Sequence, residues 1–492
     1  MLKKINYIKL FLYLCIILYV VYRIFLLFVF NFQYTDHDQL SMWYATASFA
    51  HFDFWQPRWF GGNKNAMIES ILAVPFYWIG VKLKYALPIV TCILSLIPFS
   101  FLILSCIRKK EYDKALTILV YLSFMGVNYD LLSSAPRSFV SGLALMSIAI
   151  YLLSVNKFLF ISGLLIPIAI MSTATSLIII TFVSIIYFLS NIKNLKNLLK
   201  NLSNYKFFAL GFIFGSLIYY YSSYFYEVIC KECSASKLSL NWTFDIFLNN
   251  FPSFNESFKA FSVLPIGLIT ICFLGVMLIL FLYKKSYFNF FSWLLVLVLS
   301  FSLYSFSKVS DYSHDSFYLP QFRLFMYVPI LVAIAIYYTF SYKSKFFYYV
   351  ILSIVFVFSL SFKLNKLSNI NNDSYYMTIC NVIPYKINDM EKNIQLIVNN
   401  EKNNGNSYII FSDILDTGYV YLLNSLYYDS FFSHLRDYGF EIFSQQIRQK
   451  ISNNDIKAIS IYNHDMNREV VNFDNPDLKT WLKENSPYGC RL

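Results

Sequence analysis

Long apolar runs separated by short polar loops make up the first three quarters of the chain. A run of about 17 or more mostly apolar residues is long enough to cross a bilayer as a helix. About eleven runs fit or approach this length, at residues 8–30, 85–107, 114–132, 138–155, 157–171, 174–190, 207–226, 262–283, 287–306, 321–340 and 346–362. The pattern therefore predicts an all-α polytopic membrane domain over residues 1–363.

One apolar segment, residues 66–81, departs from this pattern. It is shorter than a span and contains Pro75. Such a segment is tolerated at membrane depth where protein or a water-filled cavity covers it. We therefore expect an interfacial or re-entrant helix there.

The pattern changes near Lys363. Beyond it the apolar runs shorten, and Asn, Asp, Lys and Ser become more frequent. Residues 407–414 and 456–462 are short apolar runs typical of strands, and residues 419–428 are typical of a short amphipathic helix. These features predict a small C-terminal α/β domain over residues 364–492.

Lysine and arginine in the short loops set the orientation of membrane helices, because basic loops stay in the cytoplasm. Counting the spans in order puts the basic segments on one side of the membrane: residues 3–4, 108–110, 193–200, 284–285 and 343–345. The N-terminus is therefore predicted to be cytoplasmic. The first outer loop (residues 31–65) and the C-terminal α/β domain are predicted to lie on the extracytoplasmic side of the cell membrane.

Composition supports a membrane protein and narrows its function. The chain is 57% hydrophobic and only 14% charged, which is too few charges to cover a soluble domain. The net charge of +12 is explained by the basic loops, so we expect no nucleic-acid partner. The first run lacks a small-residue cleavage site and is longer than the apolar h-region of a signal peptide, so we expect a retained span. There is no P-loop, G-x-G-x-x-G, H-E-x-x-H or G-x-S-x-G motif.

The eight cysteines indicate no metal site. Cys230 and Cys233 fall in a predicted outer loop as a local disulfide or free thiols, and the sequence leaves this open. A pairing of Cys380 with Cys490 is equally open. The remaining four lie in apolar runs and are expected to be inert: Cys15, Cys92, Cys106 and Cys272.

Two carboxylates open the first outer loop. Asp36 and Asp38 directly follow the first span, in a chain with few charges. A carboxylate there can take a proton from an acceptor hydroxyl, or two carboxylates can hold a divalent cation such as Mg²⁺ or Mn²⁺. The alternative is a helix N-cap, since the residues after Asp36 favour a helix. His37, between the two, is expected to be a bystander or a hydrogen-bond partner.

A second candidate cluster follows in the same loop and lines the expected substrate cavity. Arg58 has the planar fork that suits a phosphate, and Glu69 begins an apolar segment where a carboxylate should face a polar cavity. Aromatic faces suit a sugar or a lipid, and glycines allow close backbone approach. The stretch supplies both, as Trp55, Trp59, Phe60, Gly61 and Gly62. The alternative is an aromatic belt at the membrane interface.

Two arginines lie at predicted outer ends of spans. Arg137 follows S-S-A-P, and Arg323 follows L-P-Q-F. By default such arginines snorkel to lipid headgroups. Outer arginines are nevertheless disfavoured statistically, so these two together with Arg58 indicate a bound anionic group such as a lipid phosphate.

These motifs together resemble the membrane glycosyltransferases of the C superfold. The resemblance is carried by one span, an outer loop that opens with an acidic pair, two glycines ahead of Glu69-Ser70, and A-V-P-x-x-x-x-G at residues 73–80. Similar proteins are the bacterial relatives of protein O-mannosyltransferases and of lipid A aminoarabinose transferases. The family's acidic pair corresponds to Asp36 with His37, or to Asp36 with Asp38. Arg323 followed by a proline in the same span also matches.

The resemblance implies an enzyme that transfers a sugar from a polyprenyl-phosphate donor to a glycan, lipid or protein acceptor, with inversion, on the non-cytoplasmic face. By mechanism, Asp36 would be the general base and Asp38 would position the acceptor or bind a metal, while the resemblance leaves open which of the two carboxylates is catalytic. Some members of the family require a divalent cation and others do not. Arg323, Arg137 and Arg58 would then neutralise the leaving phosphate.

Two other functions fit the same sequence. A lipid-linked glycan ligase or polymerase would use a pyrophosphate donor and depend less on Asp36. A non-enzymatic flippase or transporter for a lipid-linked glycan would show charges buried within the spans and internal repeats. The sequence shows no internal repeat, and the charges we recognise lie at span ends, which favours transfer over transport.

Overall fold

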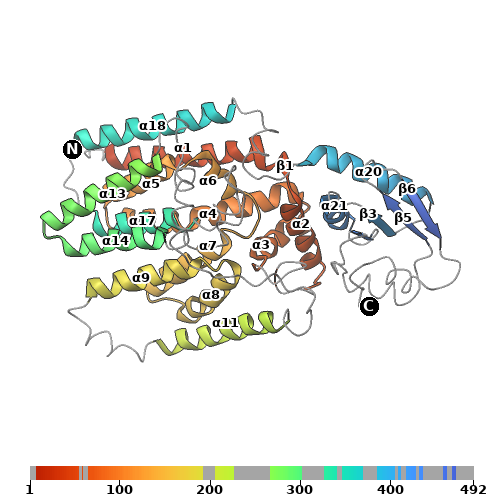
Figure 1. Cartoon of the computed structure of the whole chain (residues 1–492), viewed down its shortest axis with the longest axis horizontal. Coiled ribbons are helices and arrows are strands. Elements are labelled where there is room, and N and C mark those ends of the chain that lie inside the picture. The colour runs from red at the N-terminus through yellow and green to blue at the C-terminus, as the bar shows by residue number, and fades with distance from the viewer. Residues whose placement is uncertain are drawn as a thin grey trace, which may run out of the picture.

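The protein, described here from a computed structural model, is a bundle of helices with a small sheet at one end (Figure 1). The helices of the bundle run alongside one another; α1 begins at one end, and β3, β5 and β6 gather at the other. The structure describes residues 7–54, 58, 65–191, 205–225, 266–301, 326–340, 346–368, 385–404, 408–411, 417–427, 432–435, 458–462 and 468–472.

Apolar helices form the bundle, as the sequence predicts. They are α1 (Tyr7–Leu26) with its continuation η1 (Leu27–Asn31), α4 (Leu83–Arg108), α5 (Tyr112–Phe124), α6 (Val127–Leu132), α7 (Ser141–Ser154), α8 (Leu159–Ser172), α9 (Ser176–Asn191), α11 (Lys206–Tyr224), α13 (Ile266–Tyr283), α14 (Tyr287–Phe301), α17 (Val328–Thr339) and α18 (Phe346–Ser368). Within the described residues, three segments are long and apolar enough to cross a membrane: Ile8–Asn31, Leu83–Arg108 and Tyr349–Ser368. The count of eleven spans stays a prediction.

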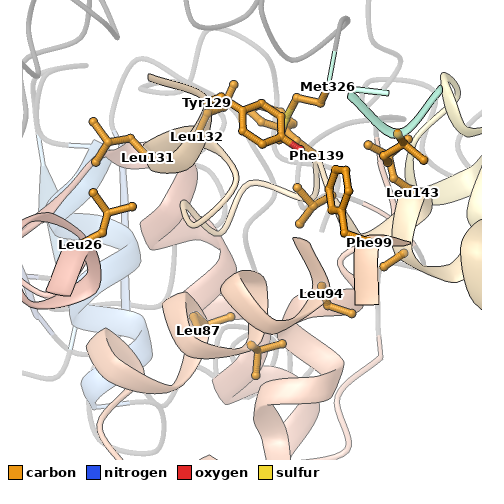
Figure 2. Packing of buried hydrophobic residues seen from close by; sticks show 14 of the residues in the cluster. Leu26, Leu87, Leu94, Phe99, Tyr129, Leu131, Leu132, Phe139, Leu143 and Met326 are labelled. Carbon is orange, nitrogen blue, oxygen red and sulfur yellow. The ribbon is translucent and has the colours of Figure 1, made fainter. Parts of the chain in front are cut away.

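Large aliphatic and aromatic side chains fill the centre of the bundle. Figure 2 shows Leu26 of α1 facing Leu131 of α6, and Phe99 of α4 beside Phe139 of the segment after α6. Buried side chains of this kind interdigitate at the packing density of small-molecule organic crystals. This core holds the 130–140 segment against α1 and α4.

Glycines allow α8 and α11 to pack closely. A Cβ on Gly163 would lie 2.1 Å from the carbonyl oxygen of Phe208, and one on Gly211 would lie 2.0 Å from that of Phe160. Small residues at such crossings let two membrane helices approach to backbone contact.

The predicted first outer loop contains a long helix. Residues 37–50 form α2 (His37–Ala50), and α3 (Ile68–Trp78) follows within the predicted interfacial segment. At 1.5 Å per residue, the 11 residues of α3 are far too short to cross the ~30 Å core of a bilayer. The predicted span at residues 114–132 is in fact two helices, α5 and α6, which are separated at Met125 and Gly126.

The C-terminal elements include a four-stranded sheet in the order β4-β3-β5-β6. Strand β3 is parallel to β4 and β5, and β5 is antiparallel to β6. The predicted strands at 407–414 and 456–462 contain β3 and β5, and the predicted helix overlaps α21. The elements are β2 (Tyr385–Lys386), α20 (Ile387–Asn404), β3 (Tyr408–Phe411), α21 (Thr417–Leu426), β4 (Phe432–Leu435), β5 (Ala458–Tyr462) and β6 (Arg468–Asn472).

These C-terminal elements lie against the first outer loop. The short strand β1 (Tyr34–Thr35) pairs with β2, and the Ile387 amide donates to the Gln33 carbonyl at 3.0 Å. Lys84 of α4 forms an ion pair with Glu391 of α20 at 2.8 Å. Helix α21 packs on α2. Asp36, one residue after β1, therefore lies where the bundle meets the C-terminal elements.

Candidate functional site

Asp36 caps helix α2. Its Oδ1 accepts a hydrogen bond from the Gln39 amide at 3.1 Å, and its Oδ2 accepts one from Gln39 Nε2 at 2.6 Å. The backbone is extended at Asp36, with φ −143°, and becomes helical at the next residue. The capping interpretation of the sequence is therefore confirmed, and the carboxylate is 0% exposed.

Arg137 is the charged partner of Asp36. Its Nη2 contacts Asp36 Oδ2 in a buried ion pair, and its Nη1 lies 3.9 Å from Asp38 Oδ2. The Arg137 side chain is 3% exposed, so it does not snorkel to the surface. Asp38, at 32%, is the exposed member of the acidic pair. The structure thus places one guanidinium between the two carboxylates.

Glu69 of α3 contacts the segment that carries Arg137. It is fully buried at the start of α3, and its Oε2 accepts a 2.7 Å hydrogen bond from the Ser138 amide. Ser138 has φ 57°, a left-handed conformation that a serine rarely adopts. Burial raises the pKa of the Glu69 carboxyl to about 8, although the Ser138 and Ser141 amides favour its charged form.

Stability should fall as the pH rises, because of Glu69. Its folded pKa of about 8 lies above its ordinary 4.5, so the folded state holds the proton more tightly. The contribution of protonated Glu69 to the free energy of unfolding is complete below the pKa of the unfolded state. It is lost as the pH rises toward the pKa of the folded state, by up to about 1.4 kcal/mol per pH unit. We expect the melting temperature in detergent to decline between about pH 5 and pH 8. Glu69→Gln should remove that decline, and an unchanged slope would contradict the assignment.

Arg58 is held by a different helix. It donates to Ser222 Oγ at 3.0 Å, to Ser223 Oγ at 2.7 Å and to the Tyr219 carbonyl at 3.4 Å, all on α11. Its guanidinium also lies 5.0 Å from the centre of the Tyr219 ring. These contacts explain its burial by packing between the loop and α11.

Other predicted site residues fall outside the described part of the chain. The backbone of His37 begins α2, and its side chain lies outside the described part of the structure. Asn65, at the end of the aromatic stretch, donates to the Ser138 carbonyl at 3.3 Å. The residues that lie outside are Arg323, Trp55, Trp59, Phe60, Gly61 and Gly62, together with Cys230, Cys233, Cys380 and Cys490.

As arranged here, the acidic pair does not fit a divalent cation. Both oxygens of Asp36 accept hydrogen bonds, and the Arg137 guanidinium occupies the space near both carboxylates. Mg²⁺ and Mn²⁺ prefer several oxygen ligands without a competing cation. Among the described residues, no group of three or more His, Cys, Asp and Glu could hold a metal ion.

A second buried ionic cluster was not predicted from the sequence. Asp130 of α6 pairs with Arg23 of α1 at 3.0 Å and with Lys363 of α18 at 2.6 Å. The Tyr22 hydroxyl donates to the same carboxylate at 2.8 Å. All three charged side chains are at most 3% exposed. We call these three charged residues the Asp130 cluster.

The Asp130 cluster also holds the start of the segment that carries Arg137. Arg23 Nη2 donates to Ser133 Oγ at 3.0 Å, to Ser134 Oγ at 2.8 Å and to Ser95 Oγ at 3.1 Å. Arg137 follows Ser134 by three residues. The cluster could have been predicted from charged residues that lie within apolar runs of the sequence, since ionisable residues in membrane spans are rare and typically functional.

Comparison with known proteins supports the fold alone. No protein-family model and no curated protein match the sequence. The crystal structure of ArnT from Cupriavidus metallidurans in the apo state is similar, with a TM-score of 0.54 over 93% of each chain. The chain has the GT-C fold. The two sequences are only 9% identical. The resemblance to membrane glycosyltransferases of the C superfold is therefore supported by architecture.

Proposed function

We propose that this protein is an extracytoplasmic membrane glycosyltransferase that uses a polyprenyl-phosphate sugar. The observation that carries the proposal is the buried Asp36–Arg137 pair at the end of a GT-C bundle. One member of the pair is a potential base, and the other is a potential phosphate ligand. The reaction needs both groups near one another.

The donor phosphate would bind Arg137. In this arrangement Arg137 is shared by Asp36 and Asp38. A phosphate accepts a bidentate guanidinium contact, which is among the strongest hydrogen-bonded pairs in proteins. An arriving donor would therefore draw Arg137 from Asp36 and leave the Asp36 Oδ2 atom with the Gln39 Nε2 hydrogen bond alone. This exchange would activate the base only when the donor is present.

Freed Asp36 would act as the general base. It would take the proton from the acceptor hydroxyl while that oxygen attacks the anomeric carbon. The bond from the anomeric carbon to the phosphate oxygen would break, and the polyprenyl phosphate would leave with its charge neutralised by Arg137. Attack opposite to the leaving group inverts the anomeric centre. The balance needs no other reactant.

The acceptor would approach from the side of Asp38 and α21. Asp38 is the exposed carboxylate, and Tyr421 of α21 is buried beside α2, with its ring centre 6.4 Å from that of Tyr44. Burial, with a smaller contribution from the Asp38 charge, raises the pKa of the Tyr421 phenol. A neutral phenol and a carboxylate are both suited to hydrogen-bonding a sugar hydroxyl.

A lipid-linked glycan transporter is the second candidate, and the Asp130 cluster favours it. Charges buried within apolar helices are typical of transport pathways. The three charged groups of this cluster are, however, paired with one another and sealed by packing. We therefore interpret the cluster as structural and rank transport second.

The test is sugar transfer by detergent-purified protein from a panel of synthetic polyprenyl-phosphate sugars. Wild type should consume at least one donor, and Arg137→Ala should lose most of that activity, whereas Glu111→Gln, in a partly exposed ion pair, should not. Release of polyprenyl phosphate and glycosylated product is measured by chromatography. If no donor is consumed and a lipid-linked glycan crosses liposome membranes instead, the transporter is correct.

A further inference from the structure

A pocket lies between α4, α7, α9 and α17, away from Asp36. Its volume is about 110 Å³. The C-terminal halves of α4 and α7, from Pro98 and Ser147 onward, line the pocket. The N-terminal ends of the same two helices approach α3 and Glu69. The pocket therefore belongs to the half of the bundle opposite to the candidate site. The sequence predicts this half to be cytoplasmic.

The walls of the pocket are mostly apolar and partly open to the surroundings. Phe101 stacks on Tyr151, with ring centres 4.5 Å apart and an interplanar angle of 3°. Aliphatic side chains such as Leu102, Ile150 and Ile334 complete the walls. Several of these side chains are half-buried at the surface of an apolar helix bundle, so we expect the pocket to open to lipid rather than to bulk water.

Three cations gather beside the pocket. Arg108 Nη1 donates to the Tyr151 hydroxyl at 2.5 Å, and Lys109 Nζ donates to the Tyr337 hydroxyl at 2.8 Å. Both tyrosines line the pocket. Lys114 Nζ lies 5.8 Å from the centre of the Tyr337 ring and 3.2 Å from Glu111. Among the described residues, Arg108, Lys109 and Lys114 together with Glu111 carry a net charge of +2.

We propose that this pocket binds an anionic phospholipid of the inner leaflet. The phosphate would lie between Arg108 and Lys109, and a segment of one acyl chain would lie against Phe101 and Tyr151. The two basic side chains are already directed to the pocket by the tyrosines, so little side-chain entropy is lost on binding. Basic pockets between membrane helices on the cytoplasmic side suit anionic headgroups.

Basic loops alone do not explain the arrangement. Lys284 and Lys285 follow α13 and are equally exposed, yet among the described residues no pocket-lining tyrosine contacts them. They supply the general attraction to an anionic leaflet that any cytoplasmic lysine supplies. Lys109 adds a defined contact at a pocket that takes the lipid chain. Lys284 is therefore a matched control for Lys109.

Native mass spectrometry tests the proposal, with dioleoyl phosphatidylglycerol and dioleoyl phosphatidylcholine as probes for the detergent-purified full chain. Wild type should retain phosphatidylglycerol in clear preference to phosphatidylcholine. Lys109→Ala should weaken its retention about fivefold, which corresponds to the loss of one cation near a lipid phosphate. Lys109→Arg should restore it, and Lys284→Ala should leave it unchanged. Equal retention of both lipids by wild type would overturn the proposal.

A second variant separates the pocket from the charge. Ser147→Phe places a ring in the pocket and leaves the three cations in place, so phosphatidylglycerol retention should fall as it does for Lys109→Ala. Glycerol 3-phosphate, which has the headgroup chemistry without the chain, should not compete at millimolar concentration. If Lys109→Ala is not monodisperse, Tyr337→Phe is measured in its place, because it removes the hydroxyl that Lys109 contacts. Phosphatidylglycerol retention should fall in this variant too. Equal loss in Lys109→Ala and Lys284→Ala would show general electrostatic attraction and sink the proposal.

Discussion

Asp36→Asn is expected to lower sugar transfer by about 10²- to 10⁴-fold, the contribution of a general base. The amide has nearly the shape of the carboxylate but cannot take the proton of the acceptor hydroxyl. Asparagine is as good an N-cap as aspartate. The bond from the Gln39 amide and the start of α2 should therefore survive. Initial rates at saturating donor measure the loss.

Asp38→Asn is the matched control for this loss. Asp38 lies two residues away, is 32% exposed and is 3.9 Å from the same guanidinium. We expect less than about a tenfold change, because an amide still hydrogen-bonds an acceptor. A larger loss for Asp38→Asn than for Asp36→Asn would reverse the two roles.

A neutral double variant guards against misfolding. Asp36→Asn leaves Arg137 buried with only the more distant Asp38, and an unpaired buried charge destabilises a protein. In Asp36→Asn with Arg137→Gln, the pair is replaced by two neutral side chains. If this double variant melts near wild type and is still inactive, the loss is chemical.

Local chemistry made parts of the site predictable. An aspartate before a helix-forming stretch predicts a cap, and Asp36 is one. The sequence offered capping and catalysis as alternatives; the structure shows the cap, and the catalytic role stays a proposal. Oδ1 receives the Gln39 amide, while Oδ2 faces Arg137. Glu69 was predicted to face a polar cavity, and it instead meets backbone amides.

Long-range pairings were beyond the sequence. Asp36 and Arg137 lie 101 residues apart, and Lys363 and Asp130 lie 233 apart. Periodicity and propensity describe neighbours within a few turns, so they say which helices exist and not which polar groups meet. The contact of β1 with β2 is likewise set by tertiary packing, because strands of two residues carry no pattern.

Asp130→Asn is expected to lower the free energy of unfolding by about 3–5 kcal/mol, the cost of removing one partner from a buried ion pair. Asp130 is the carboxylate shared by Arg23 and Lys363, so its loss leaves two cations facing each other without water. Denaturant titration in mixed micelles measures the change. Glu111→Gln breaks the partly exposed pair with Lys114, and there we expect less than about 1 kcal/mol.

For Lys363→Met, in the same cluster, we expect only a small loss of stability. The cluster carries two positive charges and one negative, so removing Lys363 leaves a neutral Arg23–Asp130 pair that keeps the Tyr22 hydroxyl. Replacement of a buried ion by an apolar side chain is often neutral or stabilising. We therefore expect Lys363→Met to cost much less than Asp130→Asn. If both cost the same, contacts with Lys363 other than its charge hold α18 to the bundle.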